Sequence, residues 1–356
     1  MTHDIKFGMY GPFEPLEVLY ETALHAEALG LDSYWLGDRL IAFPTPAVIE
    51  MWCALSALAV RTERIELGVS VTDPFRRNPG VFAQTVVAVD HISGGRVIPG
   101  IGIGEKINLV PFGIKMEETG ERNRARVEEF VRVTRELWRG EPVDWEGEFF
   151  QMSGAIVQPR ALQEPHPPLW LAGNNQQSLE LVGRVADGWL PAAKSPEMYA
   201  DDLRAIRAEA ERSGRDPDTI TPGLFMYTVV NEDREHARSV ALDLGRAILV
   251  WWRDSLARLR VRAGTNQLSI VNFDGTPATM ERWFAAGREI PEARAAELIN
   301  FGTEVEVSER VRAFVDAGVR HFVVVSLDGL GDLASWKRTA AVFAERIKPG
   351  VAGVTV

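Results

Sequence analysis

The segment 67–108 constrains the fold of this chain more than any other, because it contains strand, helix and strand in immediate succession. Residues 64–71 form an apolar stretch typical of a buried strand. Asn78 followed by Pro79 is a typical helix start, and Gly94 is a typical helix end. Two strands joined by one helix form a right-handed unit, so we expect parallel neighbouring strands whose carboxyl ends lie together.

Glycines crowd the end of the second strand, at positions 100, 102 and 104, and Glu105 and Asn108 follow directly. Glycine weakens a strand, so its use here indicates the close approach of a ligand or of a packed helix. The glycines alone leave both interpretations open. An acid and an amide directly after them favour a site at this strand end.

Strands and helices alternate along the rest of the chain. Strands are predicted at 5–10, 33–36, 64–71, 169–172, 188–191, 221–230 and 321–326, in addition to the strand that ends in the glycines. Eight strands, each followed by a helix, predict an α/β fold of the (β/α)8 type, a TIM barrel. We expect one domain over residues 1–356, with a hairpin and loop inserted at about 143–168 and helices inserted near the barrel mouth at about 233–300. A doubly wound sheet with a separate helical domain is the alternative architecture.

The composition excludes several classes of partner. The chain has 356 residues and a net charge of −11, which argues against nucleic acid and against an anionic membrane surface, and no apolar run is long enough to cross a membrane. One cysteine, Cys53, lies in an apolar helical stretch, so no disulfide can form within the chain and a buried thiol is expected. No signal peptide is evident, which favours the cytoplasm, and no His and Cys cluster has metal-ligand spacing.

In a barrel of this type the chemistry lies at the carboxyl ends of the strands. This topology selects Asp38 and Arg39, the segments 70–73, 102–108 and 173–177, Lys194, and residues 326–328. Ordinary structural interpretations stay open: a surface ion pair between Asp38 and Arg39, a solvated Lys194, and a capped helix start at 173–177, which would also suit a phosphate. None of the six histidines is placed as a strong general base.

Six motifs together resemble the luciferase-like superfamily, and within it the branch that uses the deazaflavin coenzyme F420. They are DSYWLGD (32–38), LGVSVTDPFRRNP (67–79), GGRVIPGIGIGEKIN (94–108), LWLAGNN (169–175), ADGWLP (186–191) and GRDPDTITP (214–222). Their order and spacing match that family, whereas residues 233–300 match it much less well. The resemblance implies a (β/α)8 barrel whose mouth holds coenzyme F420, in a homodimer that acts on a small molecule.

The resemblance also implies roles for individual residues. Ser70–Val71 matches a non-prolyl cis peptide that bulges against the coenzyme ring. Glu105 and Asn108 match an acid and an amide near the reactive ring, and the turn 173–175 matches a phosphate-contacting turn. The predicted cofactor contacts, which include further residues at the same strand ends, are Asp38, Ser70, Val71, Asp73, Gly102, Gly104, Asn108, Gly173, Asn174 and Asn175.

The chain departs from its branch at one position. A ketoreductase and a sugar-phosphate dehydrogenase of this branch carry histidine directly after the aspartate, and this chain has Arg39. In the dehydrogenase that histidine is the proposed base, a task that a permanently protonated guanidinium cannot perform. Lys194 matches a lysine that binds the substrate phosphate of the dehydrogenase, so it is a predicted substrate contact.

We expect hydride transfer between the deazaflavin and a carbonyl or an activated C=C bond. Glu105 is predicted to supply the proton if a dry pocket raises its pKa, and Arg39 is predicted to polarise the substrate oxygen. Trp251 and Trp252 are predicted to line a pocket for a hydrophobic substrate, with simple helix packing as the alternative. Two rival functions stay open: an FMN-dependent monooxygenase of the same superfamily, and a non-catalytic relative.

Overall fold

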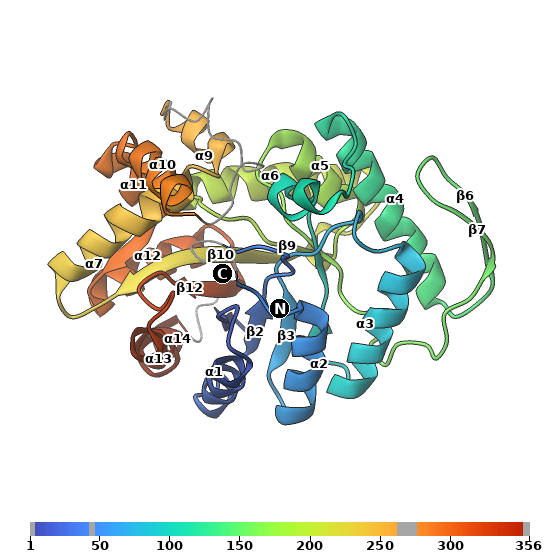
Figure 1. The fold of residues 1–356 in the computed structure, drawn as a ribbon, viewed down its shortest axis with the longest axis horizontal. Coiled ribbons are helices and arrows are strands. Elements are labelled where there is room, and N and C mark those ends of the chain that lie inside the picture. The colour runs from blue at the N-terminus through green and yellow to red at the C-terminus, as the bar shows by residue number, and fades with distance from the viewer. Residues whose placement is uncertain (1–3, 43–46, 262–275, 352–356) are drawn as a thin grey trace.

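The computed structural model describes residues 4–42, 47–261 and 276–351. Its strands are β1 (Lys6–Tyr10), β2 (Ser33–Leu36), β3 (Glu66–Val69), β4 (Val97–Ile98), β5 (Gly100–Ile101), β6 (Val143–Glu146), β7 (Gln151–Ala155), β8 (Trp170–Leu171), β9 (Gly188–Trp189), β10 (Thr221–Val230), β11 (Asn300–Gly302) and β12 (His321–Ser326). Only β6 and β7 pair antiparallel among these described strands. The others form one parallel sheet, which helices surround (Figure 1).

The parallel sheet closes on itself through one interrupted strand. Its neighbours run in the order β4-β3-β2-β1-β12-β10-β9-β8-β5. The first and last members, β4 and β5, are consecutive in the chain and are separated only by Pro99, so the two ends of the row meet in one extended segment. A further parallel bridge joins Thr72 to Ile101. With β4 and β5 taken together, the row has the eight members of a barrel, and the predicted (β/α)8 fold is confirmed.

The unit β3–α3–β4 forms as its local signals predict. The Asn78 side chain accepts a hydrogen bond of 2.8 Å from the Gly80 N–H, which satisfies one of the free donors at the start of α3 (Pro79–Ser93). Gly94 ends the helix with a φ of 68°, a conformation that suits glycine. The strands β3 and β4 are parallel neighbours with Leu67 opposite Val97.

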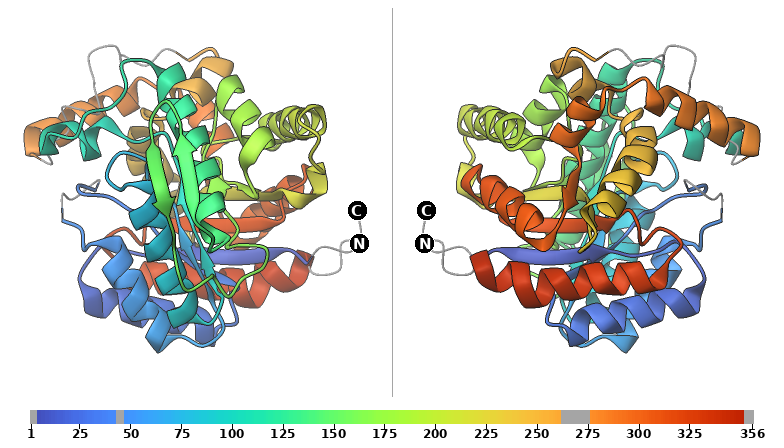
Figure 2. Two further views of the ribbon diagram at one scale, coloured as in Figure 1. Left: turned by 90° about the vertical axis from the view of Figure 1, so that its right-hand side faces the viewer. Right: turned by 90° about the vertical axis from the view of Figure 1, so that its left-hand side faces the viewer.

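Helices cover the outside of the barrel, as the two side views show (Figure 2). They are α1 (Leu16–Ala28), α2 (Met51–Arg61), α3, α4 (Gly120–Trp138), α5 (Gln176–Val185), α6 (Pro196–Arg212), α7 (Arg234–Val240), α8 (Arg246–Leu249), α9 (Arg253–Arg258), α10 (Pro277–Arg288), α11 (Glu292–Leu298), α12 (Glu304–Asp316), α13 (Leu333–Val342) and α14 (Lys348–Val351). Short 3₁₀ turns lie at Lys106–Asn108, Val110–Phe112 and Pro217–Thr219, and π turns lie at Ala241–Gly245 and Phe343–Ile347. No described helix is long and apolar enough to cross a membrane.

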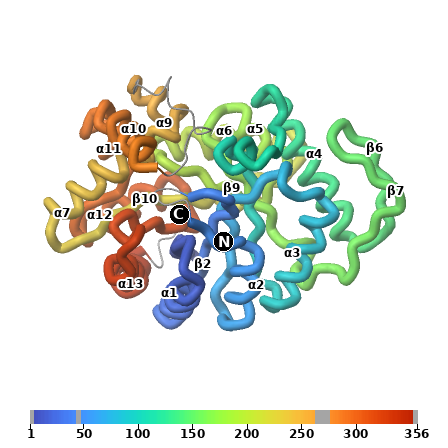
Figure 3. The backbone as a smooth tube through the Cα atoms, in the orientation of Figure 1, coloured from blue at the N-terminus to red at the C-terminus, as the bar shows by residue number. Residues whose placement is uncertain are grey.

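Two stretches of the described residues depart from the alternation of strands and helices, one at 143–168 and one within 233–300. The hairpin β6–β7 forms a separate small sheet at the edge of the molecule (Figure 3). Glu129 of α4 anchors it, because its carboxylate accepts hydrogen bonds from the Trp145 side chain and from the backbone of Phe149 and Phe150. The second insertion contributes α7 to α11, and its residues 262–275 lie outside the described residues.

Two details of the sequence prediction are wrong. The strand β11, which pairs with the end of β10, was not predicted, because three residues are too short to carry a hydrophobic period. Cys53 was expected to be buried, but it is exposed on α2. Its neighbours Trp52 and Ala54 face the core, so the apolar character of this helix belongs to a face that excludes Cys53.

Candidate active site

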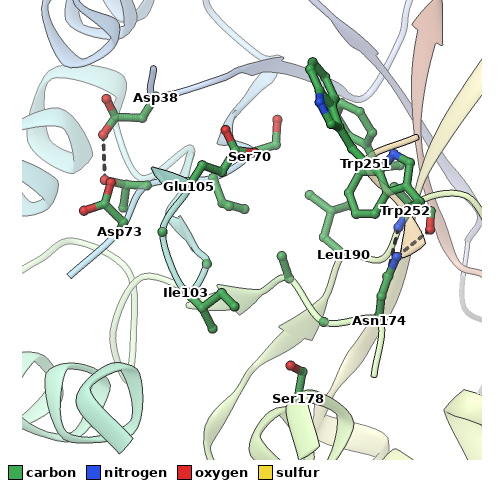
Figure 4. Close-up of a pocket in the computed structure, with 18 of the residues that line it drawn as sticks. Asp38, Ser70, Asp73, Ile103, Glu105, Asn174, Ser178, Leu190, Trp251 and Trp252 are labelled. Carbon is green, nitrogen blue, oxygen red and sulfur yellow. Dashed lines mark hydrogen bonds between the residues drawn. The ribbon is translucent and has the colours of Figure 1, made fainter. Parts of the chain in front are cut away.

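A cavity of about 440 Å³ lies at the carboxyl ends of the barrel strands. The predicted site residues that line it are Asp38, Arg39, Ser70, Val71, Asp73, Gly102, Gly104, Glu105, Asn108, Gly173, Asn174, Asn175, Trp251 and Trp252. In Figure 4 the two tryptophans lie on one side of this cavity and Asp38 and Asp73 on the other, with Glu105 and Ser70 between them. Topology therefore located the cavity, since these residues come from loops that follow different strands.

Arg39 and Glu105 form an ion pair in the wall of the cavity. Arg39 Nη1 lies 2.9 Å from Glu105 Oε2, and Arg39 Nη2 donates to Glu105 Oε1 at 3.1 Å. Asn108 fixes both segments, because its Nδ2 donates to Glu105 Oε2 and its Oδ1 accepts from the Leu40 and Ile41 N–H groups. The open alternative of an ion pair between Asp38 and Arg39 is wrong, since Arg39 pairs with an acid 66 residues away.

The surroundings of Glu105 differ from the dry pocket that the sequence analysis expected. The Glu105 side chain is 41% exposed, because it stands at the open mouth of the barrel. The groups that contact its two oxygens, from Arg39 and Asn108, are all donors. In this arrangement the carboxylate therefore acts as a hydrogen-bond acceptor at both oxygens.

Two phenols that the sequence analysis missed stand beside Arg39. Burial raises the pKa of Tyr10 to about 12, and the Arg39 charge opposes this rise. Burial likewise raises the pKa of Tyr227. Burial lowers the pKa of the Arg39 guanidinium, whereas Glu105 and the two tyrosines raise it. The second effect is the larger, so this pKa lies above its usual value. Tyr10 is the last residue of β1 and Tyr227 lies three residues before the end of β10, so only Tyr10 shares the strand-end signal that selected the other residues.

Asp38 lies in the cavity wall, but its carboxylate is occupied by the protein. Its oxygens accept hydrogen bonds from Arg76 at 2.9 Å, Arg77 at 2.7 Å and the Thr72 hydroxyl at 2.6 Å. Arg76 also pairs with Asp73 at 2.6 Å. Asp38 is buried with these partners, so it fixes the loop 70–77 against the end of β2.

The peptide bond between Ser70 and Val71 is cis, as the resemblance implies. Both residues line the cavity, and the Ser70 hydroxyl is a buried polar atom without a hydrogen-bond partner in the described residues. The glycines opposite serve packing as well, because a Cβ on Gly102 would lie 2.8 Å from a Val71 methyl group. Ser70 is thus a polar group that faces the cavity and lacks a protein partner.

The turn 173–175 lies between β8 and α5. The Asn175 side chain accepts a hydrogen bond from the Ser178 N–H and so caps α5, whose first turn faces the cavity. The Asn174 amide donates to the Ala192 carbonyl at 2.9 Å and ties this turn to the next loop. Free N–H groups at a helix start suit an anion such as a phosphate.

Aromatic side chains form the opposite side of the cavity, and we call them the aromatic wall: Tyr10, Phe225, Tyr227, Trp251 and Trp252. Neighbouring rings meet edge-on or tilted, with centroids 5.1 to 6.4 Å apart from Tyr10 through Phe225 and Tyr227 to Trp252. Trp251 also packs edge-on against Trp283, so this residue lines the cavity and takes part in helix packing as well. The wall offers an apolar surface that borders the ion pair through Tyr10 and Tyr227.

Lys194 requires a correction. It does not line the cavity among the described residues, and its side chain is fully buried. Its Nζ lies 2.7 Å from Asp202 Oδ2 and donates to the Asn174 carbonyl at 3.1 Å. A lysine committed in this way cannot reach a substrate phosphate, and it is not the solvated residue of the alternative interpretation.

Comparisons with known proteins agree with this geometry. The sequence profile of the luciferase-like monooxygenase family matches residues 4–321. A phthiodiolone/phenolphthiodiolone dimycocerosates ketoreductase from Mycobacterium kansasii is 30% identical over 351 residues, 88% of this chain and 92% of the relative. An F420-dependent glucose-6-phosphate dehydrogenase from Nakamurella multipartita is 31% identical over 334 residues, 90% of each chain. The structure of a coenzyme F420-dependent tetrahydromethanopterin reductase from Methanopyrus kandleri has the same fold, with a TM-score of 0.81 at 22% identity over 98% of this chain and 99% of that one.

Proposed function

Since this chain belongs to the luciferase-like monooxygenase family, we propose that it is an oxidoreductase that transfers hydride between coenzyme F420 and a small, largely hydrophobic carbonyl or enone. The observation that carries the proposal is the cavity itself, where the Arg39–Glu105 ion pair borders the aromatic wall. The names of the ketoreductase and of the F420-dependent dehydrogenase support the reaction type and the coenzyme.

The residues around the cavity fit such a coenzyme. Ser70 offers a buried hydroxyl that has no hydrogen-bond partner in the described part of the chain, and the first turn of α5 offers backbone donors for an anionic group. The loops 70–73, 102–104 and 173–175 would hold the coenzyme. When bound, the reduced deazaflavin supplies a hydride, and the protein supplies orientation, exclusion of water and proton transfer.

Arg39 is proposed to hold the substrate oxygen. Its guanidinium is fixed by Glu105 and is flanked by Tyr10 and Tyr227, so it stands preorganised at the edge of the aromatic wall. A fixed positive charge stabilises the negative charge that develops on a carbonyl oxygen during reduction. The apolar rings of the wall would contact the rest of the substrate and exclude water.

Glu105 is proposed to exchange the proton. As an acceptor at both oxygens it is ready to take a proton from an alcohol, and in the reverse direction the same group returns it. The reductive direction therefore requires Glu105 to be protonated before each turnover. Buried Tyr10 and Tyr227 keep their own protons at neutral pH, because burial raises the pKa of both phenols.

An FMN-dependent monooxygenase is the second candidate. The first turn of α5 suits the phosphate of FMN as well as that of a deazaflavin. The family name, which denotes monooxygenases, also favours this alternative. It predicts oxygen consumption, which the first proposal does not require.

Parallel titrations with the two cofactors separate the two candidate functions. The purified protein is titrated with coenzyme F420 and with FMN while the quenching of tryptophan fluorescence is recorded, because Trp251 and Trp252 line the cavity. We expect micromolar or tighter binding of F420 with little binding of FMN, followed by reduction of ketones or enones in a screen. Preference for FMN, with oxygen uptake when the flavin is reduced, would overturn the proposal and the roles given to Arg39 and Glu105.

A further inference from the structure

A chain of charges runs from the turn 173–175 to α9, the helix that follows the tryptophans of the aromatic wall. Lys194 and Asp202 are buried, and the Arg258 side chain is one-third exposed. Lys194 Nζ donates to the Asn174 carbonyl and pairs with Asp202 Oδ2 on α6. Arg258 Nη1, on α9, donates to Asp202 Oδ1 at 2.7 Å. These contacts join three segments that are separate in the chain, and none of the three charged side chains lines the cavity.

The helix α9 carries this chain of charges to the cavity. Arg253 and Asp254, at its start, line the cavity together with Trp251 and Trp252, which precede it. Arg258, at its end, is the residue held by Asp202. The pair of Arg258 with Asp202 therefore helps to hold the helix that follows the tryptophans, whose rings also contact Trp283 and Tyr227.

Lys194 is more deeply buried than a lysine of an exposed loop, and burial of its charge costs free energy. Burial lowers the pKa of Lys194, and Asp202 opposes this shift. Such a charge is tolerated in the interior only when its partners satisfy it. Lys194 meets this condition through Asp202 and the Asn174 carbonyl, and it also senses the charges of Arg258 and Asp254. The Lys194 ammonium thus shares the Asp202 carboxylate with Arg258 of α9.

We propose that Lys194, with Asp202 and Arg258, is a positioning residue that couples the turn 173–175 to the tryptophans of the aromatic wall. The existence of the coupling does not depend on the proposed function. Its role rests on the proposed function, in which this turn holds the anionic end of the coenzyme and the wall holds the substrate. A shift of either segment moves the other through the shared carboxylate. The pair replaces the phosphate contact that Lys194 was predicted to make.

Hydrogen exchange in the ligand-free protein tests the coupling without any coenzyme. Arg258→Met cuts the link at a side chain that is one-third exposed, so the protein is expected to stay folded. We expect amide exchange to rise at least about fivefold both in 251–258, next to the substitution, and in 172–175, beyond Asp202. Arg258→Lys, which keeps the charge, should restore most of the protection.

A matched control is Arg135→Met. Arg135 is 23% exposed and pairs with Asp187 at 2.7 Å, but Asp187 precedes β9 and so lies at the other end of the barrel. Exchange in 172–175 should stay unchanged in this control. If Arg258→Met leaves exchange in 172–175 at the wild-type rate, or if the control raises it equally, the coupling is overturned. If the Lys194→Met variant folds, amide exchange should rise in both segments. If it does not fold, Arg258→Met alone decides the question.

The affinity for coenzyme F420 gives the second readout. Arg258 does not line the cavity, yet Arg258→Met is expected to raise the Kd for F420 at least about threefold, whereas Arg135→Met leaves it unchanged. An unchanged Kd in Arg258→Met overturns the coupling. Absence of F420 binding in the wild-type protein would overturn the proposed function instead, and the exchange experiment on the ligand-free protein would still decide the coupling.

Discussion

The two ends of the barrel carry polar side chains in opposite states. At the amino end, His321 and the Ser33 hydroxyl share a hydrogen bond of 2.6 Å, and the Trp35 N–H donates to the same hydroxyl at 2.7 Å. All three residues are buried, and the rings of Trp35 and Trp170 both pack edge-on against His321. At the carboxyl end, Glu105 stays partly exposed and the Ser70 hydroxyl has no partner in the described residues.

The strand β2 connects both states, because Ser33 begins it and Asp38 and Arg39 follow its end. A buried polar group costs stability unless it is hydrogen-bonded, and Ser33, Trp35 and His321 at the closed end satisfy theirs with one another. The open end keeps accessible acceptors, which a ligand can use. We infer that polar residues of the closed end determine stability, whereas those of the open end determine chemistry.

The largest effect is expected from Glu105→Gln, which tests the open end. The amide keeps the size of the side chain but cannot exchange a proton, so hydride transfer to a ketone should slow about 10²- to 10⁴-fold. The free energy of unfolding should change by less than about 1 kcal/mol, because the side chain is partly exposed. Single-turnover kinetics with reduced F420 and urea unfolding measure the two quantities. Glu21→Gln, outside the barrel on α1, serves as a control, and an unchanged single-turnover rate in Glu105→Gln would falsify the role of Glu105 in proton exchange.

Asp38→Asn tests whether burial or position decides the role of a polar side chain, because Asp38 lies at the open end but is buried like a residue of the closed end. Arg76 keeps its pair with Asp73 and Arg77 keeps its pair with Glu50, but both lose the buried carboxylate that they share, so the free energy of unfolding should fall by about 1–3 kcal/mol. Urea unfolding measures the loss. A loss of less than about 1 kcal/mol, within the range of an exposed pair, would mean that Asp38 belongs functionally to the open end.

The pH dependence of stability tests whether His321 is buried without a charge at the closed end. Burial lowers the pKa of His321 from 6.5 to about 3, and the nearby Lys6 adds to this effect. Between these values the unfolded chain binds a proton that the folded chain does not, so His321 contributes a loss of stability as the pH falls below 6.5. The contribution approaches about 1.4 kcal/mol per pH unit.

The check is urea unfolding at several pH values between 6.5 and 4, in the wild type and in His321→Gln. The variant has no group that titrates at this position, so its stability should fall less steeply on acidification. The Glu105→Gln protein is the matched control and should retain the wild-type slope contributed by His321. Parallel slopes in the wild type and His321→Gln would contradict the closed state of the amino end.

The smallest effect is expected from Tyr227→Phe, since Tyr227 combines features of both ends. Its hydroxyl accepts the hydrogen bond of 3.1 Å from the Trp252 side chain, so the substitution removes one buried acceptor. The free energy of unfolding should fall by about 0.5–1.5 kcal/mol, and the KM for a hydrophobic ketone should rise more than kcat falls. A large fall in kcat at constant KM would instead make Tyr227 a proton donor of the open end.

Several elements followed from local sequence signals. Asn78, Pro79 and Gly94 determined the limits of α3, because caps and the conformational freedom of glycine act within a few residues. Alternation of strands and helices predicted the barrel, and the barrel predicted that the ends of its strands form the cavity. The resemblance added the cis bond at Ser70–Val71, which no local signal indicates.

What the sequence by itself determined is therefore the barrel, most of its element limits and the loops that form the cavity. Only the tertiary structure decided which charges meet: Arg39 pairs with Glu105, and Lys194 pairs with Asp202 instead of facing the cavity. The exposure of Cys53 and the strand β11 were decided in the same way. The physical reason is that caps and periods depend on neighbours in the chain, whereas ion pairs and burial depend on segments that packing brings together from distant positions.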